Sequence, residues 1–145
     1  MFKKETRIWQ VDDPVSEARR ISQGNMAGYL GIEFLKAGDC WIQAKMPVDE
    51  RTRQPAGVLH GGASVVLAET LASTAAHFSL NSSSQYCVGL EINANHIRTV
   101  REGYVWGCAT SMHLGRSTQV WEVLITDDSD TTICVSRCTM AILSK

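Results

Sequence analysis

The chain has 145 residues, 44% hydrophobic and 20% charged, with a formal net charge of −1. This length and composition predict one globular domain over residues 1–145. The near-zero charge argues against a nucleic-acid-binding protein or one that binds anionic membranes. No apolar run reaches the roughly 20 residues of a membrane span, and the charged start lacks the apolar stretch of a secretory signal. We therefore expect a cytoplasmic protein.

The five cysteines are an odd number, dispersed along the chain and without a CxxC pair. This pattern is unlike a disulfide scaffold or a zinc knuckle, so we expect reduced cysteines that serve mostly as small core residues. The four histidines show no HExxH or similar ligand spacing. The sequence therefore predicts neither a metal site nor another cofactor.

Hydrophobic periodicity and turn residues predict the order of secondary structure elements. Acidic residues and Pro14 mark the start of a short helix, and the two-residue alternation before Pro47 marks a strand. The predicted elements are a helix at Val15–Ser22, strands at Ile32–Lys36 and Cys40–Met46, a helix from Gly61 to about Leu80, and strands at Tyr86–Arg98, Tyr104–Met112, Thr118–Asp127 and Thr132–Leu143. One long helix among consecutive strands predicts the α+β class, with an antiparallel sheet wrapped around the helix.

Glu69 is an unusual residue for the long helix. The stretch from Gln54 through Ile97 contains no Lys or Arg and only one other acidic residue, Glu91. A helix this apolar is expected to be buried on most sides, and a buried carboxylate is rare unless it is paired. No basic residue lies three or four positions away, whereas Ser73 lies on the same face. We therefore predict a functional carboxylate rather than one of an exposed charged strip.

His60, Gly61 and Gly62 stand immediately before this helix. The first backbone N–H groups of a helix lack intrahelical acceptors, and glycine lets a ligand approach them closely. Such a position can hold the oxyanion that develops during acyl transfer, although two glycines can also be simple loop punctuation. The placement of His60-Gly61-Gly62 shortly before an isolated glutamate favours the functional interpretation.

At this point the sequence resembles a known family, the hotdog-fold acyl-CoA thioesterases of the phenylacetate and 4-hydroxybenzoyl-CoA type. It is most similar to the bacterial branch of enterobactin-pathway proofreading thioesterases and 1,4-dihydroxy-2-naphthoyl-CoA hydrolases. The resemblance covers about Gly24 to the C-terminus. Its motifs are Gln54-Pro55-x-Gly57-x-Leu59-His60-Gly61-Gly62-Ala63-Ser64, Leu67-Ala68-Glu69, Gly24-Asn25-Met26, Pro47-Val48-Asp49, Val88 to His96, Arg101-Glu102-Gly103, His113-Leu114-Gly115 and Gln119-Val120-Trp121.

The resemblance implies a hotdog fold and a dimer of dimers with active sites between subunits. Glu69 of one subunit, as nucleophile or general base, would face Gln54, His60 and the Gly61 N–H of another. The Gly61 N–H would bind the thioester oxygen, while Gln54 and His60 would position thioester or water. Ser73 matches a position whose hydroxyl orients the carboxylate or water.

The resemblance also implies two segments that contact CoA. The first comprises Gly89, His96, Ile97, Arg98 and Thr99, and the second comprises His113, Leu114, Gly115, Arg116, Ser117 and Thr118. Arg137 is a weaker third candidate. Taken singly, each arginine is equally compatible with an exposed surface charge. The substrate implied is an acyl-CoA with an aromatic acyl group, or the thioester of an acyl or aryl carrier protein.

Three alternatives stay open at this point. A purely structural oligomer would leave Glu69 and His60-Gly61-Gly62 without explanation, and the other two are functions of the same fold. A non-catalytic acyl-CoA-binding module would keep the pocket but would not need an isolated carboxylate. A dehydratase or hydratase would use a histidine with a carboxylate, and His60 and Glu69 are both present. The residues around them resemble thioesterases more closely.

Overall fold

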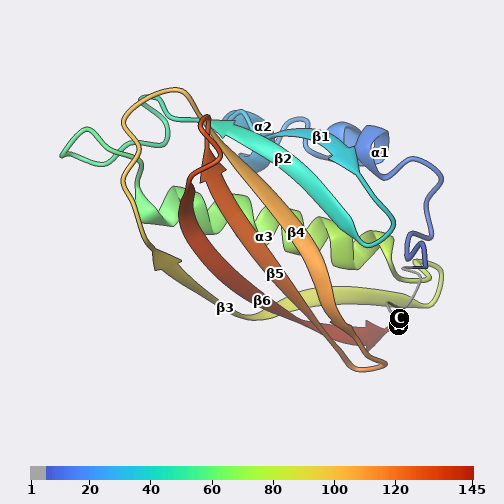
Figure 1. Cartoon of the computed structure of the whole chain (residues 1–145). Helices are drawn as coiled ribbons and strands as arrows, with labels where there is room; N and C mark the ends of the chain where they lie inside the picture. The colour runs from blue at the N-terminus through green and yellow to red at the C-terminus, as the bar shows by residue number, and fades with distance from the viewer. Residues whose placement is uncertain (1–5) are drawn as a thin grey trace.

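The computed structural model describes residues 6–145, which form one long helix held in a curved antiparallel sheet (Figure 1). The strand order is β1-β2-β4-β5-β6-β3, and every neighbouring pair is antiparallel. The elements are α1 (Pro14–Ile21), α2 (Met26–Tyr29), β1 (Glu33–Ala37), β2 (Trp41–Pro47), α3 (Gly61–Phe78), β3 (Gln85–His96), β4 (Tyr104–Leu114), β5 (Thr118–Asp127) and β6 (Thr132–Ser144). The predicted α+β class and hotdog architecture are confirmed.

The predicted elements are found with shifts of one or two residues at most ends. Two differences matter for the site. The four-residue helix α2, capped by the side chain of Asn25, was not predicted. The strand β3 ends at His96, two residues earlier than expected, so Arg98 lies beyond the strand. The backbone N–H groups of Ile97 and Arg98 both donate to the carbonyl of Ile133, which turns the chain out of the ladder.

The inner face of the sheet packs closely on α3. Leu67 and Leu71 are fully buried, and a β-carbon at Gly107 of β4 would stand 2.6 Å from Cδ1 of Leu71. Glycine is therefore needed at residue 107 for the helix and sheet to approach this closely. Beside them Trp121 is fully buried and stacks on Trp9, with ring centroids 6.4 Å apart. This core fixes α3 relative to the sheet, which in turn fixes the residues at its start.

The opposite face of α3 is left uncovered by the described chain. Gly62, Glu69 and His77 are exposed along it, and Ser73 is partly exposed between them. Strand β3 is an edge of the sheet because β6 is its only neighbour in the described chain. No helix among residues 6–145 is both long and apolar enough to cross a membrane.

Candidate active site

The start of α3 is built around His60, the N-cap residue. Its Nδ1 accepts a hydrogen bond from the N–H of Gly62 at 2.8 Å, and its carbonyl accepts from Ala63 at 2.9 Å and Ser64 at 3.3 Å. The bond from Ser64 is the first regular bond of the helix. The N–H groups of Gly62 and Ala63, together with that of His60, which donates to the Thr52 carbonyl at 2.8 Å, are three of the four donors that the helix start leaves without a regular helical acceptor. The N–H of Gly61 has no acceptor among the described residues, so it is the one available to a ligand.

A cavity of about 200 Å³ opens beside this N–H group. It brings together five of the predicted residues, and its walls are Gln54, Val58, Leu59, Gly61, Ser64, His96, Arg98, Thr99 and Ile133. Oε1 of Gln54 accepts from the N–H of Ala56 at 2.8 Å, which leaves the Nε2 group to donate to a ligand. Two kinds of N–H donor thus border one cavity, an arrangement that can bind a carbonyl oxygen and stabilise the oxyanion formed from it.

Glu69 lies on the uncovered face of α3, where the structure corrects one expectation. The carboxylate is exposed rather than buried, because it stands at the margin of the sheet, beside the edge strand β3. No charged strip surrounds it either: its neighbours on that face include Gly62, Val66, Thr70 and Ser73. The hydroxyl of Ser73 donates to the carbonyl of Thr70 at 3.4 Å. Glu69 therefore has no charged neighbour on this face of α3.

The carboxylate of Glu69 projects toward the inner side of β3. A β-carbon at Gly89 would stand 2.8 Å from Oε1 of Glu69. The pKa of Cys138, on β6, is raised to about 12, first by burial of the thiol and next by the negative charge of Glu69. Both observations place the carboxylate over the β3–β6 pair.

Helix geometry separates Glu69 from the cavity of its own chain. Glu69 follows Gly61 by eight residues, and an α-helix rises 1.5 Å per residue, so the two α-carbons are about 12 Å apart. One thioester carbonyl cannot contact both groups at about 3 Å each. Within one chain, the donor cavity and the carboxylate are two separate half-sites.

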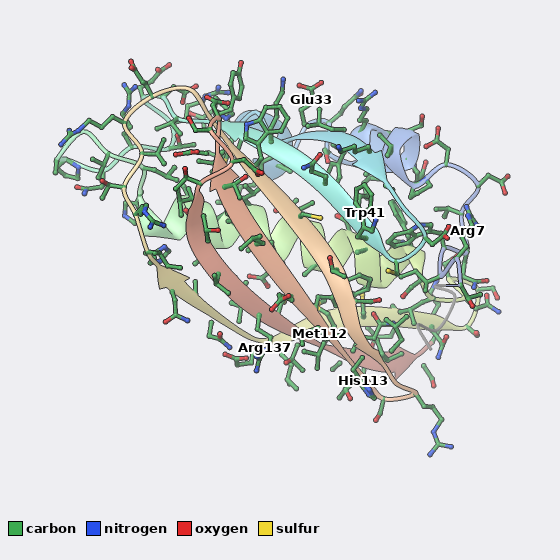
Figure 2. All side chains as sticks on the ribbon, viewed as in Figure 1. Arg7, Glu33, Trp41, Met112, His113 and Arg137 are labelled. Atoms are coloured by element: carbon green, nitrogen blue, oxygen red, sulfur yellow. The ribbon has the colours of Figure 1, made fainter. Side chains whose placement is uncertain are left out.

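The second predicted CoA segment lies at the opposite end of the sheet. His96 pairs in register with Cys134 of β6, whereas Thr118 pairs with Ala141. These positions are seven residues apart on β6, which corresponds to about 23 Å along a strand. The hairpin of His113, Leu114, Gly115, Arg116, Ser117 and Thr118 therefore does not join the cavity of its own chain. Figure 2 shows His113 at this far end of β4.

The remaining predicted residues lie outside the cavity. Ile97 is exposed between His96 and Arg98, which both line the cavity. Arg137 is exposed between buried Ser136 and Cys138, so its side chain points away from α3, as Figure 2 shows. In register it stands opposite Glu122 of β5 and Asn93 of β3.

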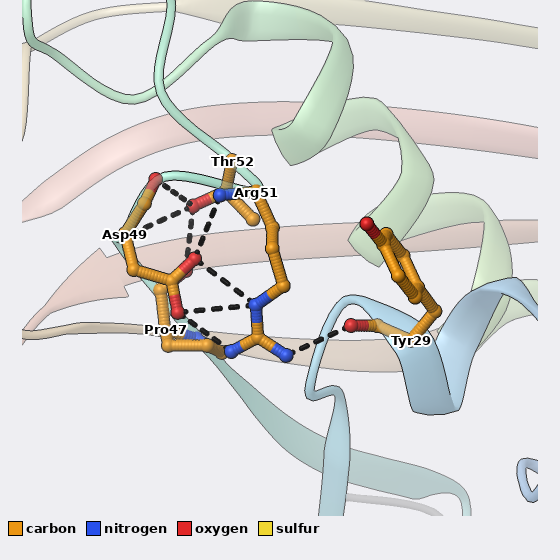
Figure 3. A network of polar contacts seen from close by, with 5 residues as sticks. All are labelled: Tyr29, Pro47, Asp49, Arg51 and Thr52. Atoms are coloured by element: carbon orange, nitrogen blue, oxygen red, sulfur yellow. Dashed lines mark hydrogen bonds and ion pairs between the residues drawn. The ribbon is translucent and has the colours of Figure 1, made fainter.

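A second hollow, of about 320 Å³, lies on the other side of His60 and was not predicted. Its walls are Met26, Leu30, Arg51, Thr52, Arg53, His60, Gly62, Ala63 and Val66. Four of these residues stand in motifs of the sequence, Met26 in Gly24-Asn25-Met26 and His60, Gly62 and Ala63 in the motif before α3. The guanidinium of Arg51 supports this wall by binding both the Asp49 carboxylate, at 2.6 Å, and the Tyr29 carbonyl, at 2.8 Å (Figure 3).

The other parts of the described chain offer fewer groups that could take part in catalysis. A hollow of about 510 Å³ beside α1 contains none of the predicted site residues. Among residues 6–145, no three His, Cys, Asp or Glu side chains gather as a candidate metal site. The chemical groups of the two half-sites are therefore the N–H donors of the cavity and the Glu69 carboxylate.

The sequence profile described as "Thioesterase superfamily" matches residues 56–134, more than half of the chain. The chain belongs to the thioesterase superfamily. It is 48% identical over 136 residues to the 1,4-dihydroxy-2-naphthoyl-CoA hydrolase of Escherichia coli, covering 94% of this chain and 99% of that protein. It is 43% identical over 136 residues to the proofreading thioesterase EntH of Cronobacter turicensis, covering 94% and 98%.

Solved structures of this family agree with the fold. A mutant of thioesterase PA1618 from Pseudomonas aeruginosa superposes with a TM-score of 0.93 at 42% identity, covering 95% of this chain and 99% of that one. Thioesterase HI1161 from Haemophilus influenzae superposes with a TM-score of 0.90 at 43% identity, covering 94% and 95%. The predicted class of enzyme, a thioester hydrolase with a hotdog fold, is confirmed.

Proposed function

We propose that this thioesterase hydrolyses acyl-CoA thioesters with an aromatic acyl group, at sites that two copies of the chain complete together. The observation that carries the proposal is the division into half-sites. The cavity beside Gly61 offers donors for a thioester oxygen but no carboxylate, and the α-carbon of Glu69 is about 12 Å along the helix from that of Gly61. A second copy that brings its Glu69 to the cavity joins the two.

In this proposal the Gly61 N–H and the Gln54 Nε2 group bind the thioester oxygen. They stabilise it more strongly as it becomes an oxyanion, since negative charge develops there in the transition state. Glu69 of the other copy either attacks the carbonyl carbon or removes a proton from an attacking water. The C–S bond then breaks, the thiol leaves with a proton, and water supplies the second oxygen of the acid. His60 orients the thioester or water.

The edge strand β3 supports pairing with a second copy. It exposes a run of apolar side chains, with Tyr86 39%, Val88 44% and Leu90 64% accessible. An exposed, apolar edge strand is a template for pairing with a strand of another chain. Proteins normally either block such an edge or use it for assembly. We propose that β3 pairs with β3 of the partner and that two such dimers form a tetramer. Such an assembly also offers a way for CoA to meet Arg98 of one copy and Arg116 of another.

The walls of the second hollow and the named relatives both support an aromatic acyl group. The hollow beside His60 has apolar walls from Met26, Leu30 and Val66, which suit a flat acyl group near the thioester. The relatives include a 1,4-dihydroxy-2-naphthoyl-CoA hydrolase and proofreading thioesterases. We therefore propose an aromatic acyl-CoA as donor, with the aryl thioester of a carrier protein as the second candidate.

A thiol-release assay over a panel of aromatic and aliphatic acyl-CoAs tests the proposal, with an aryl-loaded carrier protein included. We expect the highest kcat/KM with aromatic acyl groups, and release that depends on Glu69. The matched control is Glu102→Gln, which removes an exposed loop carboxylate outside both hollows. Enzyme that releases no thiol from any of these donors would contradict the proposal. A preference for aliphatic acyl chains would contradict the proposal that the acyl group is aromatic.

A further inference from the structure

Gly89 on β3 lies directly against the carboxylate of Glu69. A β-carbon built at residue 89 would stand 2.8 Å from Oε1 and 3.9 Å from Cδ of Glu69, and it would meet no other atom within 4 Å. The backbone of Gly89 is outside the left-handed region, so any residue could adopt its conformation. It is therefore space for Glu69, and not backbone geometry, that requires glycine here.

The strand is irregular at the same point. Gly89 pairs with Met140 of β6, whereas the next paired residue is Glu91 with Thr139, so Leu90 is an extra residue in the ladder. A bulge of this kind bends its strand and changes the direction of the neighbouring residues. The bulge therefore adjoins the residue whose missing side chain leaves room for the Glu69 carboxylate.

Little else within the chain holds this carboxylate. Among residues 6–145, Glu69 takes part in no ion pair and accepts no side-chain hydrogen bond, and the Ser73 hydroxyl donates to the Thr70 carbonyl instead. Glu69 has a flexible side chain whose end would yield to a β-carbon at residue 89. Such a β-carbon would therefore move the carboxylate with little effect on the stability of the fold.

We propose that Gly89 is a positioning residue for the hydrolysis, since its absent side chain sets where the Glu69 carboxylate stands. This inference rests on the proposed function of Glu69. Gly89 acts by leaving room for the carboxylate, and not by contact with the nucleotide of CoA. Catalytic groups must be held within about 0.5 Å of their productive positions, and a β-carbon 2.8 Å from Oε1 would displace the carboxylate by at least that much.

The first test is Gly89→Ala, assayed in the full-length enzyme with one aromatic acyl-CoA. We expect the melting temperature and the oligomeric state to be unchanged. We expect kcat to fall about 10- to 100-fold, because misplacement of a reacting group by about 1 Å has effects of this size. KM should change less than about threefold, since substrate binding does not depend on the carboxylate. An unchanged kcat, or a raised KM with kcat preserved, would overturn the proposal.

The second test asks whether the effect passes through Glu69. The Glu69→Asp side chain is shorter by one methylene and withdraws from residue 89, so Gly89→Ala should have almost no further effect on the Glu69→Asp enzyme. Equal factors of loss in the wild-type and Glu69→Asp backgrounds would show that residue 89 acts independently of the carboxylate. Glu69→Gln keeps the two proposals distinguishable. If it is inactive while Gly89→Ala is fully active, only the positioning role fails; if it is active, the proposed function fails.

Discussion

Nδ1 of His60 accepts a hydrogen bond from the N–H of Gly62 at 2.8 Å, so the side chain of His60 is the cap of the helix that carries Glu69. An accepting Nδ1 carries no proton, which places the ring proton of the neutral imidazole on Nε2. The same side chain lines the apolar hollow bordered by Met26 and Val66. His60 thus has a structural and a substrate-facing role, and the two can be separated by substitution.

We predict that His60→Ala lowers both stability and activity, whereas His60→Asn lowers activity alone. Alanine loses the cap, which costs about 0.5–2 kcal/mol of unfolding free energy, while asparagine is itself a strong N-cap residue. Both variants lose the imidazole, so kcat should fall in each. Urea unfolding and thiol release measure the two effects. Full activity of His60→Asn would limit His60 to capping.

Glu69→Gln should reduce kcat about 10²- to 10⁴-fold, the usual effect of removing a general base or nucleophile. Stability should be almost unchanged, because the carboxylate is exposed and has no ion-pair partner among the described residues. Steady-state thiol release and thermal unfolding measure this. A Glu69→Gln enzyme with near wild-type kcat would remove Glu69 from the chemistry.

Arg98→Ala and Arg116→Ala should each raise KM for CoA thioesters and leave kcat almost unchanged. Arg98 lines the cavity and donates to the Thr132 carbonyl at 2.9 Å, while Arg116 is exposed at the far hairpin. A contact to a CoA phosphate contributes about 1.5–3 kcal/mol if largely desolvated and less if solvated. Truncated pantetheine thioesters lack the nucleotide, so both variants should bind them almost normally. Equal KM increases on truncated and complete substrates would show that these arginines support the fold instead.

The sequence predicts the fold well where a hydrophobic pattern continues over many residues. The alternation in Trp41–Pro47 and the apolar run of Gly61–Phe78 are long enough to identify their elements. The helix α2 could not be predicted in this way, because four residues contain no full repeat. It depends instead on tertiary contacts such as the bond from Arg51 to the Tyr29 carbonyl.

The sequence proposes the residue types of the candidate site but not its geometry. Local sequence points to Glu69 and to the N–H groups at the start of its helix, whereas Gln54 is proposed from the resemblance to thioesterases. The expected burial of Glu69 was wrong, because the hydrophobicity of the helix does not reveal that the sheet leaves one face of α3 uncovered. The division of the CoA segments between two ends of the sheet depends on the register of β6 with β3 and β5, which local sequence does not contain.

Mixing two inactive variants tests whether the half-sites join across subunits. Gln54→Ala removes a donor from the cavity and Glu69→Ala removes the carboxylate, so homo-oligomers of either variant should be nearly inactive. A mixed oligomer contains some sites built from an intact cavity and an intact carboxylate. We expect partial recovery of thiol release after subunit exchange. Two inactive variants that exchange subunits, shown by mass spectrometry, and stay inactive would contradict the shared site.

The ion pair of Asp49 and Arg51 gives a pH-dependent prediction for stability. Arg51 holds the pKa of the Asp49 carboxyl below its ordinary value, chiefly through side-chain hydrogen bonds, and the two side chains are 27% and 31% exposed. A lowered pKa in the folded state means that the pair stabilises the protein above the unfolded pKa of about 3.9. This stabilisation is lost as the pH falls through the lower, folded pKa.

Asp49→Asn should therefore lower the unfolding free energy by about 0.2–1 kcal/mol at pH 7, the usual range for a partly exposed pair. The difference from wild type should shrink as the pH falls below about 4, because the wild-type carboxyl then also becomes neutral. Arg51→Ala should cost more at pH 7, since it also removes the bond to the Tyr29 carbonyl that holds α2. Asp39→Asn, in an exposed loop without an ion pair among the described residues, is the matched control. Urea unfolding at a series of pH values measures all four proteins, and a penalty for Asp49→Asn that does not diminish in acid would show that the charge of Asp49 is not what stabilises the loop.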